Sequence, residues 1–154
     1  MKKTTFVLVI LLLVFFLTGC GNRNNNSGIV EVRENMFITQ IDEINLNYRD
    51  YLGRTIKLEG FFRHNFWEDH HWFYVVRSVP DCCGDGGVTG FEVTWDQDFN
   101  GTNYDVDLSL WPERDAWVEA IGELGHYEFF GNRLFLVLSE LNVLETRGLD
   151  FVHR

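Results

Sequence analysis

The alternation of apolar and polar residues predicts β-strands from the second quarter of the chain onward. Residues 55–63 alternate between apolar and polar side chains, which is typical of a strand with one buried face. Residues 72–76 form a continuous run of aromatic and β-branched residues. Such a run predicts a strand that is buried on both faces.

Three more strands are predicted at residues 91–95, 117–124 and 134–138. In the first of these, Glu92 and Thr94 alternate with apolar residues and form the polar side of the strand. The chain therefore has five main predicted strands, and the fold class is mainly β.

Glycines inside the strands favour a barrel. Gly60 and Gly122 fall within predicted strands, and glycine lets a strand bend sharply at the corner of a small barrel. The order is a hairpin, a third strand, a long connection and a final hairpin, whose turn contains Gly125 and Gly131. This order fits a small five-stranded OB-like barrel, with a β-sandwich as the alternative.

A shorter element precedes the first strand. Its apolar residues fit either an edge strand or a short helix, and periodicity does not decide between the two: Phe37, Ile38, Ile41 and Ile44. Residues 47–52 predict one helical turn that ends at Gly53, because glycine commonly follows the last helical residue.

The N-terminus predicts export and lipidation. Lys2 and Lys3 precede an apolar run at residues 6–17, which suits a signal peptide and is shorter than the ~20 residues needed to cross a bilayer. The run leads into Leu17-Thr18-Gly19-Cys20, which resembles the lipobox of bacterial lipoproteins. That resemblance implies that residues 1–19 are removed and that the thiol of Cys20 carries a diacylglycerol.

The rest of the chain divides into a tether and a domain. Residues 20–34 begin with a polar stretch that has little to bury, and we expect a flexible linker there. Residues 35–154 are long enough for one domain with its own core. We expect this domain on the extracytoplasmic side of a bacterial membrane, held there by its lipid.

The net charge of the chain limits the classes of partner that it can bind. The formal net charge is −10 at pH 7, so the domain repels phosphate backbones and anionic headgroups. We therefore expect no nucleic acid partner. The lipid, and not a basic patch, is expected to supply the membrane attachment.

Three groups of residues carry a family resemblance. They are residues 45–60, the segment from Val76-Arg77 through Cys82-Cys83-Gly84-Asp85 to residues 90–93, and residues 117–122 with the closing Arg147-Gly148. Together they resemble the C-terminal OB-like domain of the YcgQ-type family of bacterial proteins, whose function is unknown. Members of that family have N-terminal membrane helices and are thought to pair with a predicted permease. The resemblance implies an OB-like fold for residues 36–152 and a permease as a partner, with a lipid anchor in place of the membrane helices.

The adjacent Cys82 and Cys83 leave three interpretations open. They could form a vicinal disulfide, which is strained because consecutive Cα atoms lie only ~3.8 Å apart, below the usual ~4.4–6.8 Å. They could bind a metal such as Zn²⁺, with Asp81 and Asp85 beside them. They could also be structural, with one thiol packed inward. The glycines that follow would allow both side chains to point the same way.

Histidines could complete a metal site at this turn. If the strand from residue 72 to residue 79 is extended, the histidines at 64–71 lie on the order of 25 Å from Cys82. They are then a solvated hairpin tip, or a weak metal-binding or pH-sensitive patch of their own. We expect His126, in the turn of the final hairpin, to lie at the same end of the barrel as the cysteines.

An acidic loop after the third strand matches part of the EF-hand pattern. The candidate Ca²⁺ ligands are Asp96, Asp98, Asn100, Thr102 and Asp107. The last position is Asp and not the bidentate Glu, and the loop follows a strand and not a helix. The alternative is a flexible acidic connection between strands.

No catalytic arrangement is present in the sequence, which lacks a G-x-S-x-G elbow, an H-E-x-x-H pair and a phosphate-binding glycine loop. We therefore expect a binding module and not an enzyme. The alternatives are a thiol redox protein of the cell envelope, or a structural interaction domain that uses exposed aromatic residues such as Phe61, Phe66, Trp67 and Trp72.

Overall fold

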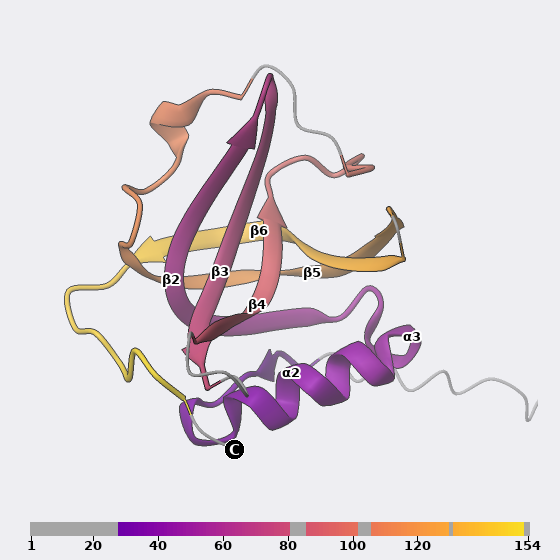
Figure 1. Ribbon diagram of the computed structural model, residues 1–154. Helices are drawn as coiled ribbons and strands as arrows, with labels where there is room; N and C mark the ends of the chain where they lie inside the picture. Colours follow the sequence, from indigo (N-terminus) through magenta and orange to yellow (C-terminus); the bar gives the residue numbers. More distant parts are fainter. Residues whose placement is uncertain (1–27, 81–85, 102–105, 130, 153–154) are drawn as a thin grey trace, which may run out of the picture.

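The computed structural model describes residues 28–80, 86–101, 106–129 and 131–152. Its six strands are β1 (Val30–Glu31), β2 (Thr55–Trp67), β3 (His70–Val79), β4 (Gly87–Thr94), β5 (Trp117–Glu128) and β6 (Asn132–Val143). They follow the order β1-β2-β3-β4-β6-β5, and a further pairing of β2 with β5 closes five of them into a barrel (Figure 1). The short β1 adds to the outside of this barrel, parallel to β2.

The strand order confirms the OB-like prediction. All pairs within the barrel are antiparallel except β4 with β6, which run parallel from the pair Glu92–Phe135 onward. A parallel pair of the third and fifth barrel strands is the arrangement that a closed OB barrel requires. The alternative of two separate stacked sheets is wrong, because all the strands belong to one sheet.

The two strand glycines lie where neighbouring backbones approach closely. The long strand β2 pairs with β5 through its first half and with β3 through its second half. At Gly60, near this change of partner, a Cβ atom would lie 2.5 Å from the carbonyl oxygen of Val76. At Gly122, beside the irregularity in the β5–β6 register, a Cβ atom would lie 2.6 Å from the carbonyl oxygen of Val137. Only glycine fits either position.

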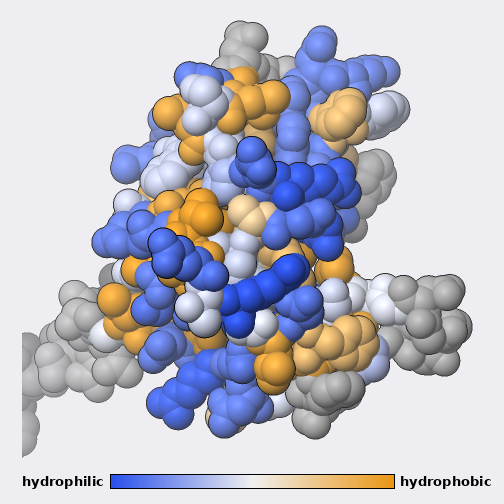
Figure 2. All heavy atoms as spheres, turned by 90° about the vertical axis from the view of Figure 1, so that its left-hand side faces the viewer, coloured by the Kyte–Doolittle hydropathy of each residue, from blue (hydrophilic) through white to orange (hydrophobic). Residues whose placement is uncertain are grey.

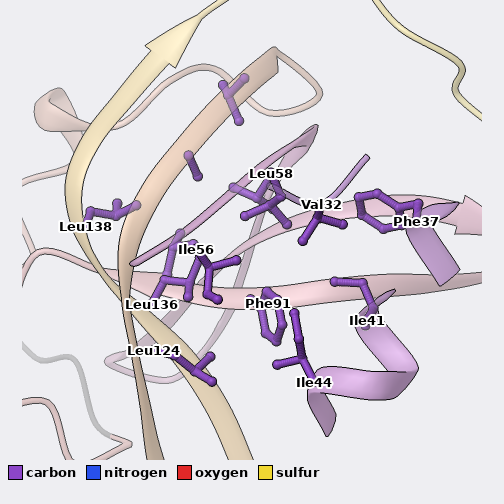
Figure 3. Packing of buried hydrophobic residues seen from close by; sticks show 14 of the residues in the cluster. Val32, Phe37, Ile41, Ile44, Ile56, Leu58, Phe91, Leu124, Leu136 and Leu138 are labelled. Atoms are coloured by element: carbon purple, nitrogen blue, oxygen red, sulfur yellow. The ribbon is translucent and has the colours of Figure 1, made fainter. Parts of the chain in front are cut away.

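The element before β2, for which periodicity did not decide between an edge strand and a helix, is a helix. A short 3₁₀ helix, η1 (Glu34–Met36), leads into α2 (Phe37–Leu46), and α3 (Tyr48–Tyr51) follows. Phe37, Ile41 and Ile44 are buried on one face of α2, and Figure 3 shows them pointing into the same cluster as the side chains of the barrel strands. This helix closes the lower end of the barrel in Figure 1.

The predicted helical turn before Gly53 is confirmed. The amide of Leu52 donates to the carbonyl of Tyr48 at 3.0 Å. Gly53 has a φ of 74°, the left-handed conformation that ends helices. Its amide donates to the carbonyl of Leu124 at 2.9 Å, which fixes the end of α3 against β5.

The final hairpin is longer than predicted. β5 continues to Glu128, so Gly125 and His126 lie within a strand and not in the turn. A Cβ atom at Gly125 would lie 2.5 Å from the ring of Phe135 on β6. Gly125 is therefore required by side-chain packing across the two strands, and Gly131 alone of the two glycines belongs to the turn.

Both ends of the described chain lie at the lower end of the barrel (Figure 1). β1 pairs with the start of β2. The C-terminal segment returns to β3, where Ser78 donates its amide to the carbonyl of Asp150 at 3.2 Å and accepts from the amide of Val152 at 3.0 Å. Within the described residues, no helix has the length and apolar character needed to span a membrane.

Candidate functional site

The adjacent cysteines belong to the connection between β3 and β4. Cys82, Cys83, Asp81 and Asp85 lie outside the described residues, as does the lipidation candidate Cys20. The strands on either side of the connection are paired to its edge, where Val79 faces Gly87 in the register. The chain therefore enters and leaves this connection from two adjacent, hydrogen-bonded strands.

A surface pocket of about 450 Å³ lies beside this connection. It is lined by Ile38 and Asp42 from α2, Val79 and Pro80 at the end of β3, and Thr89 on β4. Pro80 directly precedes Asp81, so the chain enters the cysteine-containing connection from the wall of the pocket. Asp42 is the acidic residue among the described residues that line this pocket.

His126, the histidine predicted to lie near the cysteines, lies beside Tyr48 on the surface of the barrel. It is exposed on β5, and its ring lies 5.4 Å from the ring of Tyr48 on α3, centroid to centroid. Figure 1 shows the turn between β5 and β6 at the right of the barrel and the described ends of β3 and β4 at the lower left. The joint ligation of a metal by His126 and the cysteines stays a prediction.

The described part of the acidic loop is folded by its own hydrogen bonds. The Oδ1 atom of Asp96 accepts from the amide of Asp98 at 2.9 Å, and the amide of Asp96 donates to Oγ1 of Thr94 at 3.1 Å. The carboxylate of Asp107 begins a second 3₁₀ helix, η2 (Leu108–Leu110). Asn100 is exposed, and Thr102 lies outside the described residues.

The carboxylate of Asp107 is hydrogen-bonded to Ser109. Its Oδ1 atom accepts from both the amide and the hydroxyl of Ser109, at 2.9 and 2.7 Å, and these bonds lower the pKa of the Asp107 carboxyl. This carboxylate therefore acts as the N-cap of η2. Calcium binding by the loop remains a prediction. Across the described ranges, no three His, Cys, Asp or Glu side chains are close enough together to hold one metal ion.

The acidic loop also covers the outer face of the barrel. Phe99 is buried, with its ring 5.0 Å from that of Phe135 and 5.4 Å from that of Tyr127. A Cβ atom at Gly101 would lie 2.5 Å from the Tyr127 ring. At least as far as Gly101, the loop is packed against β5 and β6, and the prediction of a flexible connection is wrong for this part.

Glu92 is hydrogen-bonded to Tyr127, at a position where the sequence predicted the polar side of the strand. Its side chain is only 5% exposed, and Thr94 beside it is also buried. The hydroxyl of Tyr127 donates to Oε2 of Glu92 at 2.6 Å, whereas Oε1 has no hydrogen-bond partner among the described residues. Burial raises the pKa of Glu92 to about 7, against the lowering effects of the Tyr127 hydrogen bond and of the Arg133 charge.

Tyr74 on β3 lies next to Glu92 in the register. Burial raises its pKa to about 12, and the Glu92 charge adds to this effect. Burial and the Glu92 hydrogen bond raise the pKa of Tyr127 as well. The outer face of β3, β4 and β5 therefore holds one carboxyl that is poised to titrate near neutral pH and two tyrosines that stay protonated.

Arg77, on β3, is buried at the opposite end of the same strand pair. Its Nε atom donates to the carbonyl of Glu59 at 2.8 Å, and its Nη1 atom donates to Oε2 of Glu34 at 2.8 Å. The guanidinium also lies over the rings of Phe37 and Trp117, 5.0 and 4.8 Å from their centroids. It therefore joins η1, β2 and β5 at one point.

The predicted hairpin tip contains a histidine pair. The Nε2 atom of His64 on β2 lies 2.8 Å from the Nδ1 atom of His71 on β3, within hydrogen-bonding distance. Desolvation and the positive charges of His71 and Arg114 lower the pKa of His64. Phe66 and Trp67 on the same hairpin are each 70% exposed, whereas Phe61 is buried. Four aromatic residues were predicted as an interaction surface, and two of them, Phe66 and Trp67, are therefore strongly exposed at the hairpin tip.

Sequence patterns indicated these residues only in part. Arg77 and Glu92 both fall within the stretches that carry the family resemblance, which was the one signal that marked them. Alternation alone assigned Glu92 to the polar side of its strand, because its partner Tyr127 comes from a different segment of the chain. The histidine pair follows from the two-residue turn between Trp67 and His70, which sequence reasoning did not define.

Comparison with known proteins gives a family and no activity. No curated protein matches the chain. The family model of the DUF1980 C-terminal domain matches residues 18–139, which is more than half of the chain and includes Arg77, both adjacent cysteines and Glu92. This match confirms the resemblance to the YcgQ-type proteins. The chain therefore belongs to the family of the DUF1980 C-terminal domain.

Proposed function

We propose that this chain is a lipid-anchored extracytoplasmic binding module that holds a transition metal, Zn²⁺ first, at the connection between β3 and β4. The observation that carries the proposal is the pocket beside that connection, which is lined by Asp42 among other residues and has Pro80, two residues before Cys82, in its wall. The proposed role is binding and delivery, without catalysis and without nucleic acid.

The chemistry of the neighbouring residues supports a soft divalent cation. Thiolates select zinc over the hard cations Mg²⁺ and Ca²⁺, and a carboxylate completes many zinc sites. Cys82 and Cys83 supply two thiols, and Asp81, Asp85 and Asp42 supply carboxylates at or next to the same connection. The net charge of −10 favours the approach of cations to the domain.

The position of the pocket supports a partner in the membrane. Figure 1 shows α2, β1 and the end of β3 together at the lower end of the barrel. β1 begins at Val30, ten residues after Cys20, and an extended tether of that length reaches about 35 Å at most. A lipid on Cys20 would therefore keep the pocket end of the domain near the bilayer surface, within reach of a permease.

The test is native mass spectrometry of the mature chain from Cys20, purified without oxygen and offered Zn²⁺. We expect one zinc per chain, lost when both cysteines are replaced by serine and weakened in Asp42→Asn. Asp50→Asn, which changes an exposed acid on α3 outside the pocket, is the matched control and should retain the metal.

Two results would overturn the metal proposal. Zinc retention in the Cys82→Ser/Cys83→Ser variant would place any binding elsewhere. A parent chain that takes up no zinc and instead loses two hydrogens in air would favour the vicinal disulfide of a thiol redox protein.

A further inference from the structure

A second surface pocket, of about 390 Å³, lies over strands β2, β5 and β6. Its lining is shared by these three strands and the loop that follows β4: Thr55, Gln97, Glu123, Val137, Leu138 and Ser139. It has no lining residue in common with the pocket beside the cysteine-containing connection. The two pockets are therefore separate features of the barrel.

Three of the lining residues form a row across neighbouring strands. Thr55 on β2 lies opposite Glu123 on β5, and Glu123 lies opposite Val137 on β6. Ile56 and Leu124, which follow the first two, are buried in the core. Because side chains alternate between the two faces of a strand, the row faces the outside of the barrel. Directly opposite residues of antiparallel strands have Cβ atoms about 4.5–5.5 Å apart, so one small ligand can contact the whole row.

Ser139 is placed in the lining by a β-bulge. The register pairs Leu138 and Glu140 with successive residues of β5 and leaves Ser139 between them as the extra residue. Bulges of this kind re-aim side chains and are common next to binding sites. The hydroxyl of Ser139 donates to the carbonyl of Ile121 at 3.1 Å, and its oxygen can still accept a hydrogen bond from a ligand.

The other polar side chains of the lining are available to a ligand. Across the described ranges, neither a hydrogen bond nor an ion pair engages the side chain of Thr55, Gln97 or Glu123. The backbone around Gln97 is already ordered, since the amide of Asp98 donates to Oδ1 of Asp96 at 2.9 Å. Three unpaired polar groups from three separate segments therefore meet at one pocket, and the cost of ordering the loop on binding is small.

We propose that this pocket binds a small molecule with one ammonium group and several hydroxyls, for which an amino sugar is the simplest example. Glu123 is the one carboxylate in the lining and would accept from the ammonium. The hydroxyl of Thr55 and the amide of Gln97 can both donate and accept, which suits the hydroxyls of such a ligand. Val137 offers an apolar contact for its carbon atoms.

The size and charge of the surroundings fit this class of ligand. The pocket volume lies within the ~300–1,000 Å³ that is usual for small-molecule sites. The net charge of −10 favours a cationic ligand over a neutral or anionic one. Glu123 is exposed, so water weakens its attraction for the ammonium. We therefore expect binding that is weak and readily reversible.

The test is an NMR titration of the isotope-labelled mature chain with D-glucosamine, without added metal and at about pH 6, where the amino group is protonated. D-Glucose is the matched neutral probe, because it has a hydroxyl in place of the ammonium. Glucosamine should cause saturable shifts of the amides of Gln97, Glu123 and Ser139. Glucose should bind about tenfold more weakly at the same amides.

Two variants test the roles of individual side chains. Glu123→Gln keeps the shape and removes the charge, so it should weaken glucosamine binding about tenfold, to the level of glucose. Thr55→Val should weaken the binding of both sugars about threefold, because it removes only a hydroxyl. Glu128→Gln is the matched control, since Glu128 is an exposed acid on the same strand outside the pocket. This control should bind glucosamine within about twofold of the parent.

Four results would overturn the proposal. They are the absence of saturable shifts with glucosamine, equal binding of the two sugars, equal losses in Glu123→Gln and Glu128→Gln, and shifts spread over the whole surface. The last result would mean attraction by net charge alone, and it would include the side of the barrel in Figure 2, where hydrophilic and hydrophobic residues are mixed. None of these results bears on the zinc proposal, because no metal is present in the titration.

Discussion

Arg77 and Glu92 are both charged residues buried in neighbouring strands, yet one is fully surrounded by partners and the other is not. Arg77 is 1% exposed and Glu92 is 5% exposed. The guanidinium has a carboxylate, two backbone carbonyls and two aromatic rings around it. The carboxyl has one tyrosine hydroxyl, and its second oxygen has no partner among the described residues.

The difference shows two ways in which a small barrel tolerates a buried charge. Removing an ion from water costs several kcal/mol, which is recovered only if its hydrogen bonds are replaced. Arg77 replaces them and in return ties η1, β2 and the C-terminal segment together. Glu92 does not, and its carboxyl instead gains a proton, as the raised pKa of about 7 indicates.

The largest expected effect on stability comes from replacing Arg77. Arg77→Met removes the charge while keeping much of the volume. It removes the donor that Arg77 provides to the carbonyl of Glu59, and it leaves Oε2 of Glu34 with the amide of Leu149 as its donor. We expect the free energy of unfolding to fall by about 3–5 kcal/mol, the usual result of removing one partner of a buried pair. Urea denaturation measures this loss.

Arg49→Met is the control for this prediction. Arg49 also lies over an aromatic ring, that of Tyr48 at 5.6 Å, but it is exposed on α3. Its replacement should change the stability by less than about 0.5 kcal/mol. If Arg77→Met were equally mild, the guanidinium would not be what joins the three segments.

The expected effect of replacing Glu92 on the free energy of unfolding depends on pH. The folded-state pKa of about 7 lies above the ordinary value of 4.5, so the protonated carboxyl favours the folded state. Its contribution is complete below about pH 4.5 and is lost as the pH rises through 7, a change of about 3 kcal/mol. Glu92→Gln keeps the shape and cannot ionise, so its stability relative to the parent should rise by that amount between pH 4.5 and 8.

Denaturant titrations of the parent and of Glu92→Gln at both pH values measure this difference. Glu140→Gln, which changes an exposed acid on β6, should show no such rise. A constant offset between Glu92→Gln and the parent at the two pH values would mean that Glu92 ionises normally in the folded protein.

A smaller effect should follow from removing the one partner that Glu92 has. The hydrogen bond from Tyr127 lowers the pKa of Glu92, so Tyr127→Phe should raise that pKa above 7. The destabilisation should be about 1–2 kcal/mol at pH 8, where the carboxylate needs its donor, and less at pH 5. Carbon-detected NMR titration of the Glu92 carboxyl measures the shift.

Tyr74→Phe provides the comparison, because Tyr74 lies next to Glu92 in the register and the Glu92 charge acts on it, but Tyr74 is itself uncharged while Glu92 titrates. It should move the pKa of Glu92 less than Tyr127→Phe does. If the two variants act alike, the 2.6 Å contact is not the bond that controls the carboxyl.

The pattern of residues along the chain predicted the structural features that depend on residues close together in the sequence. The alternation around Ile56 and Leu58 identified the inner face of β2, and Gly60 and Gly122 indicated the closure of a barrel. The surroundings of Arg77 and Glu92 depend on segments far away in the chain. Arg77 meets Glu34 across 43 positions, and Glu92 meets Tyr127 across 35. No periodicity within one strand contains this information.

The smallest effect expected is at Glu34, and it has the opposite pH dependence to that of Glu92. The amide of Leu149 and the guanidinium of Arg77 both donate to Oε2 of Glu34, at 2.9 and 2.8 Å, and together they lower its pKa. A lowered pKa favours the folded state above the ordinary value of 4.5, and this contribution is lost as the pH falls below it. Because Glu34 is partly exposed, Glu34→Gln should cost less than about 1 kcal/mol at pH 7 and still less at pH 3. Both glutamine variants would then differ least from the parent at acidic pH and diverge from it in opposite directions as the pH rises, with Glu92→Gln becoming the more stable and Glu34→Gln the less stable. If Glu34→Gln instead lost most stability at pH 3, the contact between η1 and the C-terminal segment would not depend on the ionised carboxylate.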